Sequence, residues 1–279
     1  MKELTTTYIA TLLKPRLPDS HKGTYGHALL IAGNEGKMGA AVIAARACLR
    51  SGVGLLTVNV PKAERFILQT TIPEAMLVSR ERFDSEVDNF SAIGIGPGLG
   101  TDKSSVHLLE KIFKNLKKHP KPLILDADAL NIIATNEDLF LDIPKESILT
   151  PHPKEFDRLF GLHENLSERI KTALKKAKEH RLVIVLKGHR TLITSLGETY
   201  INSTGNAGLA KGGSGDALTG IITAFLAQGY KPFEAAQLGV FIHGFAADLT
   251  LQEQSLESML ITDVIENLGK VFEELRKNK

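Results

Sequence analysis

The sequence predicts an α/β fold in which helices cover both faces of a mostly parallel sheet. Three observations indicate it: short apolar runs of strand length, helical patterns that alternate with them, and glycine-containing turns that join the two. The first unit shows all three. Residues 27–32 (HALLIA) form a strand, 33–36 (GNEG) a turn, 38–51 a helix rich in small residues, and 54–60 (GLLTVNV) the next strand. This order is typical of parallel strands joined by a crossover helix.

The remaining elements continue the alternation. We expect a short helix at residues 7–13, before the first strand. After the second strand we expect a helix at 63–70, strands at 74–79 and 92–95, an amphipathic helix at 103–118, a strand at 122–126, a helix at 128–134, a strand at 147–150, helices at 156–160 and 166–180, a strand at 182–187, a hairpin at 191–195 and 198–201, and helices at 217–227, 232–251 and 261–275. No long linker interrupts them, so we expect one domain over residues 1–279.

Composition narrows the classes of function. The chain has 279 residues, 43% of them hydrophobic, and a net charge of +2 from 34 basic and 32 acidic residues. This balance favours neither a nucleic-acid nor a membrane partner. Cys48 is the only cysteine, which excludes an intrachain disulfide and fits a cytoplasmic protein. We identify no signal peptide in the first 14 residues and no stretch of membrane-spanning length.

A glycine-rich loop at residues 206–216 (NAGLAKGGSGD) precedes the long apolar helix expected at 217–227. Its glycines allow close approach to a ligand, and the free amides and positive dipole end of the helix favour an anion, usually phosphate. Asp216 lies within this loop. Two interpretations are open: the carboxylate serves phosphate chemistry as a base or metal partner, or it only caps the helix.

Polar residues and glycines follow most of the predicted strands. Ligands of open α/β sheets bind beyond the carboxyl ends of the strands, so these residues are expected at one rim. Their convergence favours the catalytic interpretation of Asp216. Alternatives remain for its neighbours: His152 as a turn residue between two prolines, Asp126 as a helix cap, and the glycines at 96–100 as turn residues only. The residues at these strand ends are Gly96, Gly98, Gly100, Asp126, Asp128, His152, Lys187, Gly188, His189, Arg190, Thr191, Asn206 and Lys211.

Several common motifs are missing from the sequence. There is no GxxxxGK[ST] loop, no HExxH or CxxC spacing, and no GxSxG elbow after a strand. The turn at 33–36 is not GxGxxG, and the strand at 54–60 ends without the acidic residue of a dinucleotide fold. These observations disfavour P-loop nucleotidases, metalloproteases, serine hydrolases and nicotinamide dehydrogenases.

The glycine loop resembles the anion-hole motif of ribokinase-like small-molecule kinases, and the chain resembles more closely the ADP/ATP-dependent NAD(P)H-hydrate dehydratases. The resemblance implies a ribokinase-like three-layer αβα sandwich with a central, mostly parallel sheet. It also implies a stand-alone dehydratase, without the epimerase domain that many members carry. The matching segments follow one order: HKGTYG at 21–26, MGAA at 38–41, GPGLG at 96–100, LDADAL at 125–130, LTPHPKE at 149–155, LKG at 186–188, and 205–216.

The resemblance implies a lyase that returns the S-epimer of hydrated NADH or NADPH to the active coenzyme. ADP or ATP drives the dehydration; bacterial members typically use ADP and release AMP and phosphate. Mg²⁺ is expected on phosphates and water, with no protein ligand cluster. The family likeness also implies a homo-oligomer, a tetramer. Two alternatives remain: a ribokinase-like kinase that phosphorylates a hydroxyl of a vitamin precursor or sugar alcohol, and a nucleotide-binding regulator without catalysis.

Roles carry over from the resemblance by position. Asp216 would take the proton from the substrate hydroxyl, and the amides of residues 213–215 would hold the transferring phosphoryl group. The nucleotide is expected at Lys187, Gly188, His189, Arg190, Thr191, Asn206, Gly213 and Gly215. The hydrated dinucleotide is expected at Ala40, Ala41, Gly96, Gly98, Gly100, His152 and Asp216.

Overall fold

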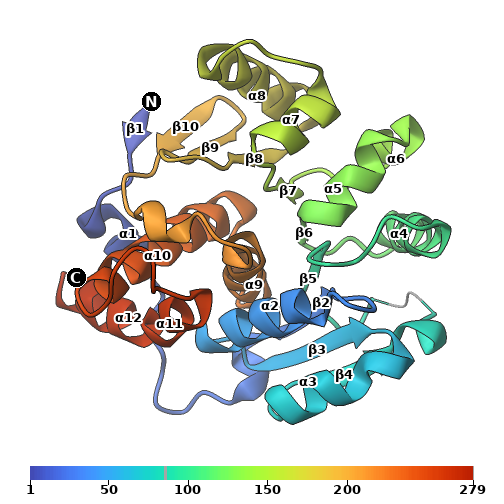
Figure 1. Cartoon of the computed structure of the whole chain (residues 1–279), viewed down its shortest axis with the longest axis horizontal. Helices are drawn as coiled ribbons and strands as arrows, with labels where there is room; N and C mark the ends of the chain where they lie inside the picture. The colour runs from blue at the N-terminus through green and yellow to red at the C-terminus, as the bar shows by residue number, and fades with distance from the viewer. Residues whose placement is uncertain (85–86, 279) are drawn as a thin grey trace.

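A ten-stranded sheet forms the centre of the computed structural model, which describes residues 1–84 and 87–278 (Figure 1). The strands are β1 (Lys2–Glu3), β2 (His27–Ile31), β3 (Leu55–Val60), β4 (Met76–Ser79), β5 (Ala92–Ile95), β6 (Leu123–Leu125), β7 (Ile148–Leu149), β8 (Val183–Leu186), β9 (Leu192–Ser195) and β10 (Glu198–Ile201). The α-helices are α1 (Thr6–Leu12), α2 (Met38–Arg50), α3 (Arg65–Thr71), α4 (Lys103–Leu116), α5 (Ala127–Ala134), α6 (Glu137–Leu141), α7 (Pro153–Phe160), α8 (Leu166–His180), α9 (Ser214–Ala227), α10 (Pro232–Leu251), α11 (Ile261–Glu266) and α12 (Leu268–Lys277).

The sheet is mostly parallel, as the sequence predicts. Its order is β1-β10-β9-β8-β7-β6-β5-β2-β3-β4. All neighbours from β8 to β4 in this order run parallel. The β9–β10 hairpin adds the antiparallel pairs, and β1 pairs in parallel with β10 at the edge.

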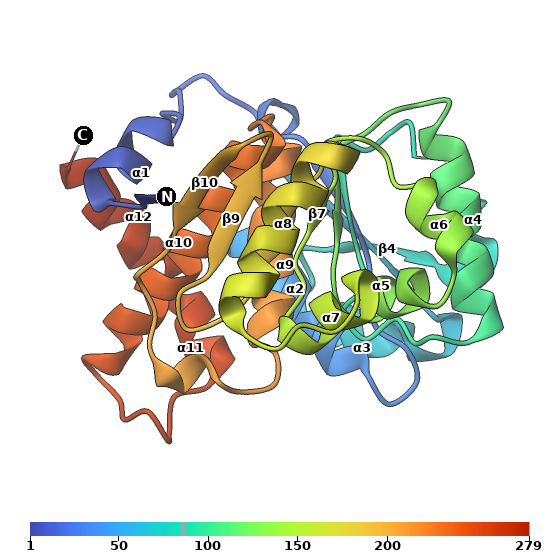
Figure 2. The same ribbon diagram turned by 90° about the horizontal axis from the view of Figure 1, so that it is seen from above.

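Two hydrophobic cores lie on opposite faces of the sheet, because successive side chains of a strand point to opposite faces. In β2, Ala28 and Leu30 belong to one core and Leu29 and Ile31 to the other. Helices α2, α9, α10 and α12 bury their apolar residues in the first core, and α4, α5 and α8 in the second. Seen from above, the sheet separates the two layers of helices (Figure 2). This arrangement confirms the predicted three-layer αβα sandwich.

Small residues bring α2 and α9 close together. A Cβ atom on Gly220 of α9 would lie 2.1 Å from the carbonyl oxygen of Ala44 in α2, so only glycine fits at this contact. The two helices are therefore held almost backbone to backbone, and the start of α9 is fixed beside the start of α2.

Several helices and strands of the structure begin or end at other residues than the sequence predicts. Helix α9 begins at Ser214, three residues before the expected 217, because Gly213 turns the chain with a φ of 94°. The helix expected at 261–275 is two helices, α11 and α12, joined at Asn267, whose Nδ2 donates to Thr250 Oγ1 at 2.9 Å. Strand β1 and helix α6 were not predicted; at two and five residues, they are too short to carry a periodic signal.

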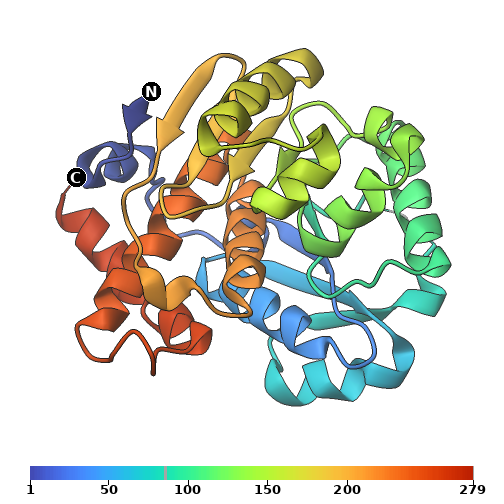
Figure 3. The same cartoon turned by 45° about the horizontal axis from the view of Figure 1, so that its top comes forward.

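The first residue and the end of the described chain, at residue 278, lie on the same side of the molecule, near β10 and α12 (Figure 3). Among the described helices, none combines the length and the apolar character needed to cross a membrane.

Candidate active site

The loops that follow the parallel strands meet at one rim of the sheet, as predicted. After β2, Gly33 N donates to the carbonyl oxygen of Pro97 after β5, at 2.8 Å. After β8, Lys187 N donates to the carbonyl oxygen of Pro151 after β7, at 2.9 Å. Strand order therefore brings together segments that are far apart in the sequence.

A buried ion pair lies at the centre of this rim. Lys187 Nζ lies 2.7 Å from Asp126 Oδ1, and Thr219 Oγ1 donates to Asp126 Oδ2 at 2.7 Å. The Asp126 side chain is 1% exposed. Asp126 occupies the N-cap position of α5, but its side chain makes no capping hydrogen bond. The carboxylate binds the lysine and α9 instead, so the helix-cap alternative for Asp126 is wrong.

Lys187 remains a cation in this setting. Burial by itself would lower the pKa of its ammonium group, but the charges of Asp126 and Glu155 outweigh that effect and raise the pKa above its usual value. Glu155 Oε2 lies 3.9 Å from the ammonium group. A fixed positive charge at the sheet rim is suited to holding phosphate.

The glycine loop forms the start of α9, and Asp216 lies in the first turn of the helix. The N-cap residue is Gly213, in the left-handed conformation, with no side-chain capping bond. The Asp216 carboxylate accepts no hydrogen bond from, and makes no salt bridge with, any residue in 1–84 or 87–278. The capping alternative for Asp216 is therefore wrong, and its carboxylate is available for another partner.

The pKa of Asp216 is raised to about 6. Burial is the main cause, the negative charge of Asp126 adds to it, and the charge of Lys187 partly opposes it. A carboxyl group with this pKa is mostly ionised at neutral pH and more basic than an ordinary aspartate, as a general base requires.

Gly215, in the glycine loop, lies next to the Lys187–Asp126 ion pair. A Cβ atom placed on Gly215 would lie 3.3 Å from Lys187 Nζ and 3.5 Å from Asp126 Oδ2. The missing side chain leaves room for a ligand atom between the amides of α9 and the lysine. The structure therefore brings together the two segments that sequence reasoning assigned to nucleotide binding.

A cavity of about 540 Å³ opens beside this point. That volume is within the ordinary range for small-molecule sites. Arg190 and Gly213 do not line it: Arg190 is exposed, and Gly213 lies against Ile43 of α2. Of the residues expected at the nucleotide or the substrate, those that line it are His152, Lys187, Gly188, His189, Thr191, Asn206 and Gly215.

His152 has a structural role and also faces the cavity. Its Nδ1 accepts hydrogen bonds from the backbone amides of Lys154 and Glu155 at 3.1 and 3.2 Å, and so caps α7. Burial is the main reason why the pKa of the imidazole is lowered, so the ring is neutral at neutral pH. The turn interpretation is therefore confirmed, while contact with substrate stays a prediction.

The two segments expected at the dinucleotide touch each other. A Cβ on Gly98, whose φ is +60°, would lie 2.9 Å from the Cβ of Ala40. Ala40 is half-buried whereas Ala41 is completely buried, so of the two only Ala40 presents a surface to a ligand. Gly96 is required by packing, because a Cβ there would lie 1.8 Å from the carbonyl oxygen of Asp126. The Gly100 amide donates to Asp128 Oδ2 at 2.8 Å.

Sequence reasoning missed four residues of the site. Glu155 and Thr219 support the ion pair, and Asp248 holds the loop by accepting from Asn206 Nδ2 at 3.0 Å and from the Gly205 amide at 2.8 Å. His243 of α10 lines the cavity; it is 7% exposed, and its Nε2 has no hydrogen-bond partner in the described structure.

The His243 imidazole is neutral under ordinary conditions. Burial, and secondarily the charge of Lys187, lower its pKa to about 4. The available signal in the sequence was a histidine inside the apolar run FIHGF at 241–245.

Within the ranges that the structure describes, no group of three or more His, Cys, Asp or Glu residues is placed to hold a metal. Mg²⁺ bound to nucleotide phosphates needs only one or two carboxylates. Asp126 and Asp128 both act electrostatically on Asp216, so acidic groups are present beside the phosphate loop.

The αβα sandwich, with an anion loop at the start of a central helix, defines a ribokinase-like protein. A ribokinase-like superfamily protein from Enterococcus faecalis has the same fold: TM-score 0.89, 30% identity, 98% of this chain and 96% of that one covered. The sequence family described as NAD(P)H-hydrate dehydratase matches residues 28–270, and the chain belongs to this family.

Relatives of two lengths match the chain. The bifunctional NAD(P)H-hydrate repair enzyme of Moorella thermoacetica is 36% identical over 98% of this chain, which spans 54% of that enzyme, about half its length. The ADP-dependent (S)-NAD(P)H-hydrate dehydratase of Listeria monocytogenes is 34% identical over 98% of both chains. The ADP/ATP-dependent NAD(P)H-hydrate dehydratase of Bacillus subtilis, co-crystallised with ATP and Mg²⁺, has a TM-score of 0.88 at 34% identity, covering 98% of both chains.

Proposed function

We propose that this chain is an ADP-dependent dehydratase that removes water from the S-epimer of hydrated NADH or NADPH and releases AMP and phosphate. One observation carries the proposal: an unpaired aspartate with a pKa of about 6, Asp216, lies at the start of α9 beside Gly215 and Lys187. The names of its full-length relatives, such as the Listeria monocytogenes dehydratase, support the choice of reaction.

The first step transfers a phosphoryl group. The hydroxyl oxygen on the nicotinamide ring forms a bond to the β-phosphorus of ADP as the bond to the AMP oxygen breaks. The hydroxyl proton goes to the Asp216 carboxylate. The free amides at the start of α9 and the ammonium group of Lys187 stabilise the charge on the transferring group.

The second step eliminates phosphate. The electron pair of the ring nitrogen helps to expel the phosphate from the ring carbon. A proton leaves the neighbouring carbon and goes to the departing phosphate, and the carbon–carbon double bond of the reduced nicotinamide is restored. Hydroxide is a poor leaving group and phosphate a good one, so a nucleotide that supplies phosphate makes the dehydration feasible.

The cavity beside Lys187 suits the nucleotide, and the rim between Ala40 and Gly98 suits the hydrated ring. In this arrangement Gly188, His189, Thr191 and Asn206 surround the nucleotide, while the α9 amides lie between it and the substrate. Bound Mg²⁺ would neutralise phosphate charge near Asp126 and Asp128.

We also infer a cytoplasmic homo-oligomer, a tetramer, in which residues 1–279 act as one catalytic domain. The family likeness supports this assembly. Light scattering coupled to gel filtration tests it, and a monomeric mass would exclude it.

The function is tested by incubating the S-epimer of hydrated NADH with ADP and Mg²⁺. Reduced-nicotinamide absorbance should return, with one AMP and one phosphate for each coenzyme. The R-epimer serves as a matched control and should not react. A stable phosphorylated product without restored absorbance would instead indicate a kinase.

A further inference from the structure

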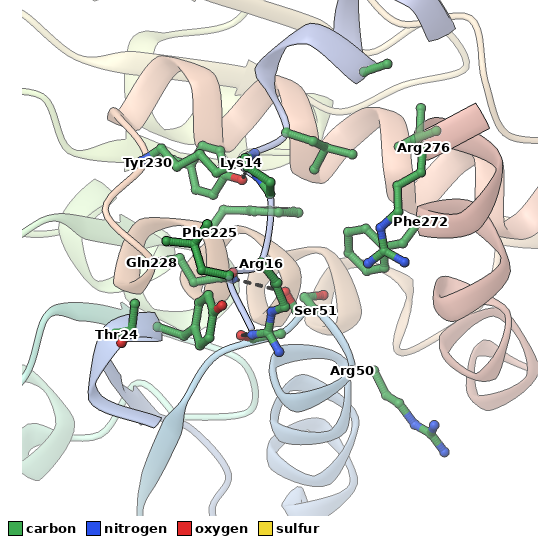
Figure 4. Close-up of a pocket in the computed structure, with 17 residues that line it drawn as sticks. Lys14, Arg16, Thr24, Arg50, Ser51, Phe225, Gln228, Tyr230, Phe272 and Arg276 are labelled. Atoms are coloured by element: carbon green, nitrogen blue, oxygen red, sulfur yellow. Dashed lines mark hydrogen bonds between the residues drawn. The ribbon is translucent and has the colours of Figure 1, made fainter. Parts of the chain in front are cut away.

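A second cavity, larger than the one beside Lys187, lies away from the site above. It has a volume of about 740 Å³ and lies at the opposite end of α9, among the end of α2, the chain after α1, and α12 (Figure 4). Phe225, near the end of α9, and Gln228, directly after it, line it. Helix α9 has 14 residues. At about 1.5 Å per residue, roughly 20 Å separates this cavity from the phosphate loop.

The lining of this second cavity is strongly basic. Lys14, Arg16, Arg50 and Arg276 line it, and no aspartate or glutamate does. Arg50 is neutralised by Glu266, whose Oε2 lies 2.5 Å from Arg50 Nη2. The three other cations form no salt bridge with a carboxylate within the described residues. Cations collected without counter-charges favour an anion.

Two of these cations are held in position by neutral groups. Lys14 Nζ donates to the carbonyl oxygen of Gly229 at 2.8 Å and lies 4.3 Å from the ring centroid of Tyr230. The Arg16 guanidinium donates to the carbonyl oxygen of Gly52 and lies 3.8 Å from the ring centroid of Tyr25. Carbonyl and ring contacts orient the cations but do not cancel their charge, and further N–H donors remain on each.

The floor of the cavity is aromatic. Phe225 packs edge-on against Tyr230 and Phe272, with ring centroids 5.3 and 6.3 Å apart. Phe272 and Arg276 lie four residues apart on α12 and therefore share one face of that helix. Figure 4 shows the Phe272 ring and the Arg276 side chain on the same side of the cavity. An apolar surface is thus placed directly beside an unpaired guanidinium.

We propose that this cavity is a second ligand site, for an organic phosphate with an aromatic body. The phosphate would bind Arg16, Arg276 and Lys14, because guanidinium groups match phosphate oxygens bidentately. The aromatic body would pack on the partly exposed ring of Phe272, behind which Phe225 is buried. The volume accommodates a ligand of nucleotide size. The site goes beyond the proposed reaction and does not depend on it.

The test uses 1-naphthyl phosphate with the complete chain, measured by fluorescence anisotropy at saturating ADP and Mg²⁺. One molecule should bind per chain without displacing ADP. Arg16→Gln combined with Arg276→Gln should weaken binding at least about tenfold, since each removes a charged hydrogen bond. The matched control, Lys171→Gln with Lys175→Gln on the exposed face of α8, loses the same charge and should change binding less than twofold.

Ligands that carry only the phosphate or only the aromatic ring should bind poorly. Inorganic phosphate and 1-naphthol should each bind at least about tenfold more weakly than 1-naphthyl phosphate, because each meets only half of the site. Equal binding of 1-naphthol would indicate a purely apolar cavity and would overturn the proposal, as would competition with ADP.

The single variant Arg276→Gln tests the proposal with a substitution that should leave the fold intact. The Arg276 side chain makes no hydrogen bond or salt bridge with a described residue, so its replacement removes charge without removing a contact. Unchanged naphthyl phosphate binding in this variant would contradict the proposal. A changed oligomeric mass with unchanged binding would instead assign the cavity to a contact between copies of the chain, and would overturn the proposal too.

Discussion

Gly215 and Lys187 lie so close that a Cβ on the glycine would be 3.3 Å from the lysine Nζ. The end of β8 therefore meets the start of α9 at a point where a side chain is missing. At this contact we propose that a lysine and a glycine loop from separate parts of the sequence hold one phosphate.

Gly215→Ala should weaken ADP binding about tenfold or more while the protein still folds. The new methyl group meets the flexible end of Lys187 and not the backbone, so the fold can adjust, but the methyl group occupies the space proposed for phosphate. Calorimetric titration with ADP measures the effect. Gly212→Ala, with no atom within 4 Å of the added Cβ, is the matched control and should bind ADP normally.

Asp216→Asn should lower kcat by about 10²–10⁴ while the affinity for ADP changes little, because the amide cannot accept the proton. Steady-state rates with hydrated NADH and direct ADP titration separate the two effects. Near-normal turnover in this variant would remove Asp216 from the mechanism.

The same variant should be more stable than the wild type above pH 6. The pKa of Asp216 is raised from 3.8 to about 6 in the folded protein. Folding therefore favours the protonated form of the Asp216 carboxyl group. The free energy of unfolding decreases as pH rises from 3.8 to about 6. The gain in Asp216→Asn should be roughly 1–3 kcal/mol at pH 7 and close to zero near pH 3.5. Thermal unfolding at both pH values measures it; a gain independent of pH would exclude titration as the cause.

Activity should rise with pH through about 6, where Asp216 loses its proton. The pH profile of kcat/KM should show this ascending limb and a plateau near neutrality. A limb with its midpoint near 4 would mean that burial does not raise the pKa of the working base.

Asp126→Asn should destabilise the fold by about 3–5 kcal/mol, because Lys187 loses the carboxylate at 2.7 Å and keeps only Glu155, at 3.9 Å, as a charge partner. Combining it with Lys187→Met should recover part of the loss, since the ammonium group that lost its nearest partner is then removed as well. Urea unfolding of the single and double variants gives the coupling energy. Additive losses would show that the pair contributes no coupling.

His243→Leu should weaken ADP binding about 3–10-fold and raise thermal stability. His243 Nε2 is buried without a hydrogen-bond partner, which destabilises the free protein. A bound nucleotide gains a hydrogen bond to this atom, and the leucine variant loses that bond. His243→Gln retains a polar group and should bind ADP more tightly than His243→Leu. Identical ADP affinity in both variants would place the nucleotide away from His243.

Local sequence determined the alternation of strands and helices, the hairpin, the phosphate loop and the candidate base, because periodicity, glycine turns and helix starts depend on neighbouring residues. The tertiary structure decided which distant residues meet. Lys187 pairs with Asp126, 61 residues away, because strand order places β6 and β8 on either side of β7. Packing between elements, which no local pattern encodes, decided three further features. It left the Asp216 carboxylate free of a capping bond, placed His243 at the first cavity, and formed the basic cavity at the other end of α9.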